Sequence, residues 1–238
     1  MPEIEFNKYK TKGTGYHWTQ NTLNPFKMNA YVKARYQNCI SILQQELGQL
    51  RNHKVLDFGC GDGVLTWEIE KAGAQGYGVD SSEIAIQFAR KKHRLLGTKA
   101  IFHCESCYET SFESNHFDAI ISTDVIEHVQ DPVRFLKEIH RVLKKDGIAI
   151  MTTPIRITES PLDKMHVAEW FPSEFQNLLG KVFPSPVMQY SHPVFWMEFI
   201  TRSNLHRYLV NCYSLLRNPF RELGGWRFAS LQYGLCRK

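Results

Sequence analysis

Long apolar stretches are absent from this sequence of 238 residues. Nowhere do about 18 or more apolar residues follow one another, which is roughly the length that a membrane-spanning helix needs. The opening residues, Met-Pro-Glu-Ile-Glu-Phe-Asn-Lys, lack the apolar core of a signal peptide. We therefore expect a soluble protein that has no membrane span, is not secreted and resides in the cytoplasm.

Dense clusters of positive charge and paired cysteine motifs are scarce as well. The net charge is +5, and the richest basic stretch, residues 90–94, ends an expected helix, where cations complement the helix dipole. No appended RNA-binding module is visible, so nucleic acid is not the expected partner. The six cysteines include one C-x-x-C, Cys104 to Cys107, without a second pair. We therefore expect reduced thiols rather than a structural zinc site.

Two common phosphate-binding patterns are also missing, namely the dinucleotide fingerprint G-x-G-x-x-G and the P-loop G-x-x-x-x-G-K-[ST]. Residues 54–63 instead read Lys-Val-Leu-Asp-Phe-Gly-Cys-Gly-Asp-Gly. This is a short apolar strand with Asp57 near its end, followed by three glycines at alternate positions and then a helical pattern. Glycines let the backbone turn sharply and approach a ligand closely. The unit therefore predicts a ligand-binding corner.

A second strand that ends in an acid lies shortly downstream, at residues 76–80. In a βαβ unit the carboxylate of Asp80 would lie at the tip of the neighbouring strand, where it can accept hydrogen bonds from both hydroxyls of a ribose. The alternative is that Asp80 caps the following helix, which we expect from about Ser82 to Leu96. Ser81 or Ser82 could fill that role instead, so we favour the ribose interpretation.

The later sequence continues the series with Glu127-His128, a helix start at Asp131-Pro132, a Lys-Lys-Asp-Gly turn, and a strand that ends in Thr153-Pro154. Together these motifs resemble the class I S-adenosylmethionine (SAM)-dependent methyltransferases, closely from about residue 52 to 154 and more loosely to the C-terminus. The resemblance implies an α/β fold, a doubly wound, Rossmann-like sheet of seven strands whose last strand is antiparallel. It also implies a methyltransferase domain at residues 52–238 with a helical insertion at about 193–220, preceded by an N-terminal helical cap at residues 1–51.

The resemblance implies SAM as cofactor, with its methionine part at the glycine turn and its ribose at the second acid. An acid at the first strand's end suits a ligand that carries a sulfonium, whereas it would repel a phosphate. Many relatives have an acid that contacts the adenine where this chain has Ser106, so Glu105, Ser106 or backbone groups would replace it. Arg35, on an expected helix from Met28 to Leu50, could pair with the SAM carboxylate or be a surface arginine. The predicted cofactor-binding residues are Asp57, Gly59, Cys60, Gly61, Gly63, Asp80, Ser81, Ser106, Cys107 and Thr123.

Asp124, Glu127 and His128 follow an apolar strand at residues 117–123, and His166 arrives from a later loop. Methyl transfer requires a positioned acceptor and, for a hydroxyl, removal of its proton. Ubiquinone-biosynthesis-type O-methyltransferases and small-RNA 2′-O-methyltransferases show E-x-x-E-H at this place. The latter also have an H-x-x-E-W step similar to the one that begins at His166, and in them two acids and two histidines bind a divalent cation. The resemblance thus implies catalytic roles for Glu127, His128 and His166. It offers as an alternative a metal site of these three residues with Asp124, whose reach is shorter than that of glutamate.

We expect the protein to methylate an oxygen of a small-molecule acceptor. The alternatives among enzymes are a 2′-O-methyltransferase that acts on RNA ends and a small-molecule N-methyltransferase. The alternative from another class is a SAM-binding regulatory protein without catalysis, which would keep the same acids and glycines. RNA binding would show as a basic stripe and a steep salt dependence.

Two segments have more than one interpretation. Residues 16–18, Tyr-His-Trp, could cover the cofactor site as a flap or pack on the core as an ordered tail. Residues 195–216 have the spacing of an amphipathic helix that is broken near Ser203-Asn204. They would form a substrate lid, or else pack in the core or against a second copy in a homodimer. For a small-molecule enzyme we expect an aromatic-lined cavity that includes Tyr16, Trp18, Trp170, Phe195 and Trp196.

Overall fold

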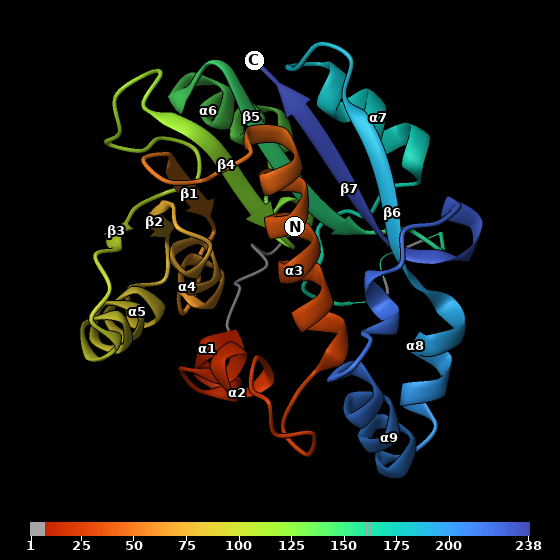
Figure 1. The fold of residues 1–238 in the computed structure, drawn as a ribbon. Coiled ribbons are helices and arrows are strands. Elements are labelled where there is room, and N and C mark those ends of the chain that lie inside the picture. The colour runs from red at the N-terminus through yellow and green to blue at the C-terminus, as the bar shows by residue number, and fades with distance from the viewer. Residues whose placement is uncertain (1–7, 160, 162) are drawn as a thin grey trace.

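The computed structural model describes residues 8–159, 161 and 163–238. A seven-stranded sheet in the order β3-β2-β1-β4-β5-β7-β6 forms its centre, and β7 runs antiparallel to both of its neighbours (Figure 1). This topology confirms the predicted doubly wound sheet with an antiparallel last strand. The strands are β1 (Lys54–Phe58), β2 (Gln75–Asp80), β3 (Ile101–Cys104), β4 (Phe117–Thr123), β5 (Leu143–Pro154), β6 (Val187–Pro193) and β7 (Ala229–Arg237).

Helices cover both faces of the sheet because side chains alternate along each strand. Val55 of β1 packs in one core cluster with α3 (Ala30–Leu47) and α4 (Val64–Lys71). Its neighbours Leu56 and Phe58 pack on the other face with α6 (Pro132–Val142) and α7 (Pro172–Gly180). A smaller cluster fixes α5 (Glu83–Leu96) beside β3.

Local signals in the sequence explain where several of these helices begin. The Ser82 hydroxyl accepts a hydrogen bond from the amide of Ala85 at the start of α5, so Ser82 rather than Asp80 is the cap. Asp131 caps α6 in the same way, with Pro132 at the first helical position. The strand that ends at Pro154 includes the expected Lys-Lys-Asp-Gly turn and begins at Leu143, because the chain passes directly from α6 into β5, whose pairing with β4 contains a shift in register.

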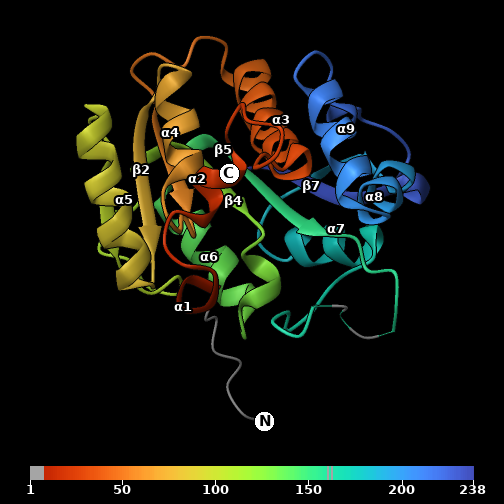
Figure 2. The same cartoon turned by 90° about the horizontal axis from the view of Figure 1, so that it is seen from below.

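The remaining described helices are α1 (Lys8–Lys12), α2 (Tyr16–Gln20), α8 (Val194–Thr201), α9 (Asn204–Ser214) and three short 3-10 turns, η1 (Ile126–His128), η2 (Pro219–Arg221) and η3 (Trp226–Phe228). Four of them, α1, α2, α8 and α9, lie below the sheet in Figure 1 and face the viewer in Figure 2. Ser203 caps α9, which confirms the predicted helix break.

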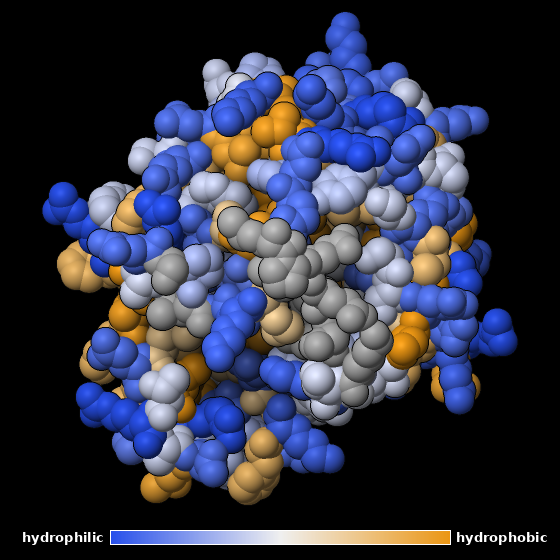
Figure 3. Space-filling view, turned by 180° about the vertical axis from the view of Figure 1, so that it is seen from behind, coloured by the Kyte–Doolittle hydropathy of each residue, from blue (hydrophilic) through white to orange (hydrophobic). Residues whose placement is uncertain are grey.

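The surface is mixed in character. Figure 3, the view from behind, shows hydrophilic side chains over most of that face, with hydrophobic ones between them in several places. Among the described residues, no helix combines the length and the apolar composition needed to cross a bilayer.

Candidate active site

A cavity of about 340 Å³ lies at the edge of the sheet where the parallel strands end. Ligands of open α/β sheets bind at this edge, because the loops that follow the strands converge there. Of the predicted cofactor-binding residues, Asp57, Gly59, Cys60, Asp80, Ser81, Cys107 and Thr123 line the cavity, whereas Gly61, Gly63 and Ser106 do not. The sequence motifs therefore converge on one space from the ends of β1, β2, β3 and β4.

The turn after β1 requires glycine for two reasons, its backbone conformation and the close packing of neighbouring side chains. Gly59, Gly61 and Gly63 all have left-handed φ angles, of +85°, +52° and +80°. A Cβ atom on Gly59 would collide with Val125, and one on Gly61 would collide with the hydroxyl of Tyr9. Gly61 and Gly63 thus shape the turn without lining the cavity.

Asp80 lies at the end of β2 and shapes the same turn. Its Oδ2 accepts a hydrogen bond from the amide of Gly61 at 2.9 Å, and its Oδ1 accepts one from the amide of Ser82 at 2.8 Å. Burial raises the pKa of this carboxyl group, while the two amides lower it. An ionised carboxylate has about four acceptor sites, so two remain for a ligand in the cavity.

Asp57 is almost fully buried at the end of β1. Its Oδ2 accepts a hydrogen bond from the Thr66 hydroxyl at 2.8 Å. Burial, together with a smaller effect of the negative charge of Asp80, raises the pKa of Asp57 to about 7, although the hydrogen bond from Thr66 lowers it. A cationic ligand beside Asp57 would therefore favour loss of its proton.

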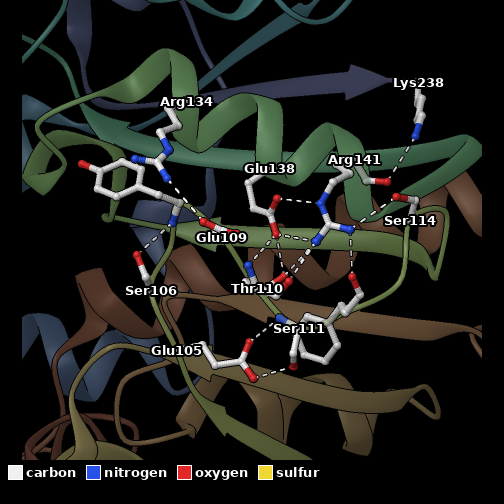
Figure 4. A network of polar contacts seen from close by, with 12 residues as sticks. Glu105, Ser106, Glu109, Thr110, Ser111, Ser114, Arg134, Glu138, Arg141 and Lys238 are labelled. Carbon is white, nitrogen blue, oxygen red and sulfur yellow. Dashed lines mark hydrogen bonds and ion pairs between the residues drawn. The ribbon is translucent and has the colours of Figure 1, made fainter.

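The loop after β3 is held against α6 by the polar network in Figure 4. Glu138 accepts hydrogen bonds from the amide and the hydroxyl of Thr110, and it also pairs with Arg141. The Tyr108 hydroxyl accepts two backbone amides at the start of α6. This anchoring brings Tyr108 to the cavity, but the hydroxyl of Ser106 instead accepts the amide of Tyr108.

The N-terminal helices cover the glycine turn. The backbone amide and the ring of His17 both bond to the buried carboxylate of Asp62, and the indole of Trp18 donates to its carbonyl. Tyr9 and His17 consequently line the cavity. His17 therefore lies where the flap interpretation predicts, whereas Trp18 packs against the core, as the ordered-tail interpretation predicts. Tyr9 carried no signal in the sequence, because its contact depends on how the segment folds back.

The aromatic lining of the cavity differs from our expectation. None of the five expected residues, Tyr16, Trp18, Trp170, Phe195 and Trp196, lines it. Trp170 packs on Phe175, and Phe195 is exposed on α8. The rings that do line it are Tyr9, Tyr36, Phe58 and Tyr108, which lie on or next to elements that surround the strand ends.

Arg35 is buried and lines the cavity, so it is not a surface arginine. It forms an ion pair with Asp124, whose Oδ1 also accepts the hydroxyl of Thr152 at 3.0 Å. Asp124 has a left-handed φ of +51°, which turns the chain sharply after β4. The predicted quartet of metal ligands is therefore divided, because Asp124 faces α3 and is not part of the cluster that the other three residues form.

Glu127, His128 and His166 do come together. One ligand atom of each lies within 4.8 Å of those of the other two, and the two rings meet edge to face at 4.8 Å between centroids. Amides of the loop before α7 donate to the carbonyl of Glu127, which brings His166 to η1.

Neighbouring acceptors fix the tautomers of both histidines. Nδ1 of His128 donates to the carbonyl of Met165 at 2.8 Å, and Nδ1 of His166 donates to Glu169 at 2.6 Å. In each ring Nε2 is then the basic nitrogen. Asp163, which we did not predict, has a carboxylate oxygen 3.9 Å from Nε2 of His166. Glu169 and Asp163 were missed because their relation to His166 depends on the course of a loop.

Comparison with known proteins agrees with this fold and site. A family model described as a methyltransferase domain matches residues 56–151. The ubiquinone biosynthesis O-methyltransferase of Pelagibacter ubique is 28% identical over 175 residues, covering 72% of each chain. That of Bradyrhizobium diazoefficiens is 31% identical over 193 residues, covering 79% of this chain and 68% of the relative.

Solved structures show the same architecture. Phosphoethanolamine N-methyltransferase 2 of Haemonchus contortus, in complex with S-adenosyl-L-methionine, superposes with a TM-score of 0.69 at 17% identity. The match covers 100% of this chain and 60% of that one, and at such low identity it supports the fold alone. From the family match and the relatives, the chain belongs to the class I SAM-dependent methyltransferases.

Proposed function

We propose that this protein transfers the methyl group of SAM to a hydroxyl oxygen of a small molecule. The observation that carries the proposal is the cluster of Glu127, His128 and His166 at the end of β4. His128 also lines the cavity, so the cluster and the cofactor pocket share one space. A hydroxyl acceptor needs a group that removes its proton or makes that proton easier to lose. This cluster can supply such a group.

The cofactor would extend across the strand ends. Its methionine part would lie at the glycine turn beside Asp57, its ribose at Asp80, and its adenine between Cys107 and Tyr108. The raised pKa of Asp57 supports a cationic neighbour, because a sulfonium there compensates for the burial of the ionised carboxylate. This orientation brings the sulfonium toward β4 and the cluster.

The cluster has the donors of a divalent-cation site. Nε2 of His128, Nε2 of His166 and a carboxylate oxygen of Glu127 would hold the ion, a set that suits Mn²⁺, Co²⁺ or Zn²⁺ better than Mg²⁺. A bound cation would lower the pKa of an acceptor hydroxyl. The chain's own contribution is to fix both imidazoles by Met165 and Glu169, so that the acceptor oxygen is held beside the methyl group.

A small acceptor and an oxygen nucleophile have independent support. The relatives are O-methyltransferases of ubiquinone biosynthesis. Ubiquinone is not a macromolecule, so these relatives favour a small acceptor. The net charge of +5 in 238 residues is modest, and the cavity carries the carboxylates of Asp57 and Asp80, which would repel a phosphate backbone.

Turnover against a panel of phenols, amines and short RNA ends tests the proposal. Dialysis against a chelator should abolish transfer to a phenol, and Mn²⁺ should restore it. His128→Ala and His166→Ala should each lower kcat by about 10²-fold or more, whereas His206→Ala, on α9, serves as the matched control and should not. Activity that survives chelation but falls in both variants assigns the histidines as general bases instead. Transfer only to amines or RNA, or full activity in both histidine variants, contradicts the proposal.

A further inference from the structure

An apolar stripe is exposed along α9. Leu205, Leu209 and Tyr213 follow one another at spacings of four residues, so they share one face of the helix, and Leu216 follows two residues after the helix ends at Ser214. Their side chains are 63%, 50%, 45% and 93% exposed. Val210 and Asn211, on the other side of α9, are the residues of this helix that are buried against the protein. One side of α9 is therefore buried against the protein, whereas the apolar side chains on its other side are exposed.

Neighbouring elements enlarge this stripe into a surface. Phe195 of α8 and Leu223, Trp226 and Phe228 before β7 are also exposed, and no residue of α8 is fully buried. Figure 1 shows α8 and α9 below the end of β6, and Figure 2 shows them side by side at the right of the molecule. Figure 3 shows hydrophobic side chains among hydrophilic ones at the lower left, which is the end where α8 and α9 lie. Exposed apolar side chains gathered at one end of a molecule in this way mark an interaction site.

The same segment carries a net positive charge. Residues 194–228 contain five arginines and two glutamates, with no lysine and no aspartate, so they carry three of the protein's five net positive charges. All five arginines are exposed. Arg217 pairs with Glu222, but in the described part of the chain Arg202, Arg207 and Arg227 have no carboxylate partner. Exposed leucines and aromatic rings combined with unpaired arginines are typical of segments that lie in the interface of an anionic bilayer.

We propose that α8, α9 and residues 217–228 form a docking surface for an anionic lipid membrane. The leucines and aromatic rings enter the boundary between headgroups and acyl chains, and the arginines pair with lipid phosphates. A second copy of this chain fits less well, because an isologous contact would bring two surfaces of net positive charge together. The docking is independent of the proposed acceptor.

The surface is fixed relative to the cavity. The side chain of Asn211 accepts the amide of Ala30 and donates to the carbonyl of Met28, which ties α9 to the start of α3. Arg35 lies five residues further along α3, about 7.5 Å at 1.5 Å per residue, and it lines the cavity. Docking would therefore hold the open edge of the sheet near the headgroups.

Sedimentation of the full chain with vesicles tests the proposal. The protein should bind vesicles that mix phosphatidylglycerol with phosphatidylcholine, bind those of phosphatidylcholine alone far less, and lose affinity as salt rises. Leu209→Glu should weaken binding by at least about tenfold. Leu95→Glu is the matched control, since Leu95 is 77% exposed on α5, away from this surface, and should leave binding unchanged. SAM affinity, measured by calorimetry, verifies that both variants are folded.

Three results would overturn the docking surface. One is the absence of binding to either kind of vesicle. Another is equal binding by the wild type and Leu209→Glu. The third is a dimer, seen by light scattering, that Leu209→Glu converts to a monomer while vesicle binding is absent, which would assign the surface to contacts between copies. Replacing Arg202, Arg207 and Arg227 together by glutamate should remove the preference for phosphatidylglycerol, and retention of that preference would exclude the electrostatic part.

Discussion

Replacing Asp57 by asparagine should change how the affinity for SAM depends on pH. The carboxyl group is 1% exposed, and burial raises its pKa from the usual 3.8 to about 7, with Asp80 adding to the effect. SAM carries a sulfonium and binds best to the ionised carboxylate. Below pH 7 the free protein must therefore release a proton when it binds SAM.

The size of the effect follows from this pKa. At pH 8 about nine tenths of Asp57 is ionised, and at pH 6 about one tenth, so the wild-type affinity should be about tenfold lower at pH 6, or about 1.4 kcal/mol. The folded protein without ligand keeps this proton up to about pH 7, while the unfolded chain loses it near pH 3.8. Asp57 therefore makes the ligand-free protein less stable as the pH rises through that window.

Calorimetry at pH 6 and pH 8, in buffers with different enthalpies of ionisation, measures both the affinity and the protons released. Asp57→Asn should lose the tenfold difference and the released proton. The α-amino group of SAM also titrates near this range, but it contributes equally to both proteins and cancels in the comparison. Asp118→Asn, at the opposite end of β4, is the control and should behave as the wild type. Equal pH profiles for the wild type and Asp57→Asn would refute the reasoning.

Asp80→Ala removes the predicted acceptor of the ribose hydroxyls, so the SAM affinity should fall by roughly 1.5–3 kcal/mol; an unchanged affinity in calorimetry refutes the ribose role. Gly61→Ala puts a Cβ against the hydroxyl of Tyr9 at a φ of +52°. It should lower the free energy of unfolding in urea by roughly 1–3 kcal/mol, and an unmoved midpoint would contradict the steric argument. Glu138→Gln weakens the bonds to Thr110, and thermal melts should show a loss of roughly 1–3 kcal/mol; a melting temperature equal to that of the wild type would mean that the charge of Glu138 is dispensable.

The fold was predictable because its signals are local. The strands that end at Phe58 and Asp80 are short apolar runs followed by glycine or a helix cap, and each forms as the pattern indicates. Ser82 and Asp131 cap helices within three residues of themselves. Such features depend on neighbours in the chain and not on the packing of distant segments.

The site was predictable only in part, because proximity in sequence is not proximity in space. Asp124 lies three residues before Glu127, yet the left-handed turn at Asp124 points its side chain toward Arg35. Conversely, Tyr9 and His17 are far from the glycine turn in the sequence, yet Tyr9 lies against Gly61 and His17 bonds to Asp62, because α1 and α2 fold back over the turn. Contacts of this kind require the packed structure.

The division of the predicted quartet changes the chemistry of the cavity. Asp124 neutralises Arg35, so a cation bound at the proposed site would meet one carboxylate and two imidazoles, a donor set that suits borderline cations better than Mg²⁺. In the described part of the chain, Nε of buried Arg35 has no hydrogen-bond acceptor. A buried donor without an acceptor costs free energy unless a ligand supplies one. Since Arg35 faces the cavity, we infer that the carboxylate of SAM is the missing acceptor, and that Arg35 fixes the methionine end of the cofactor while the cluster fixes the acceptor oxygen.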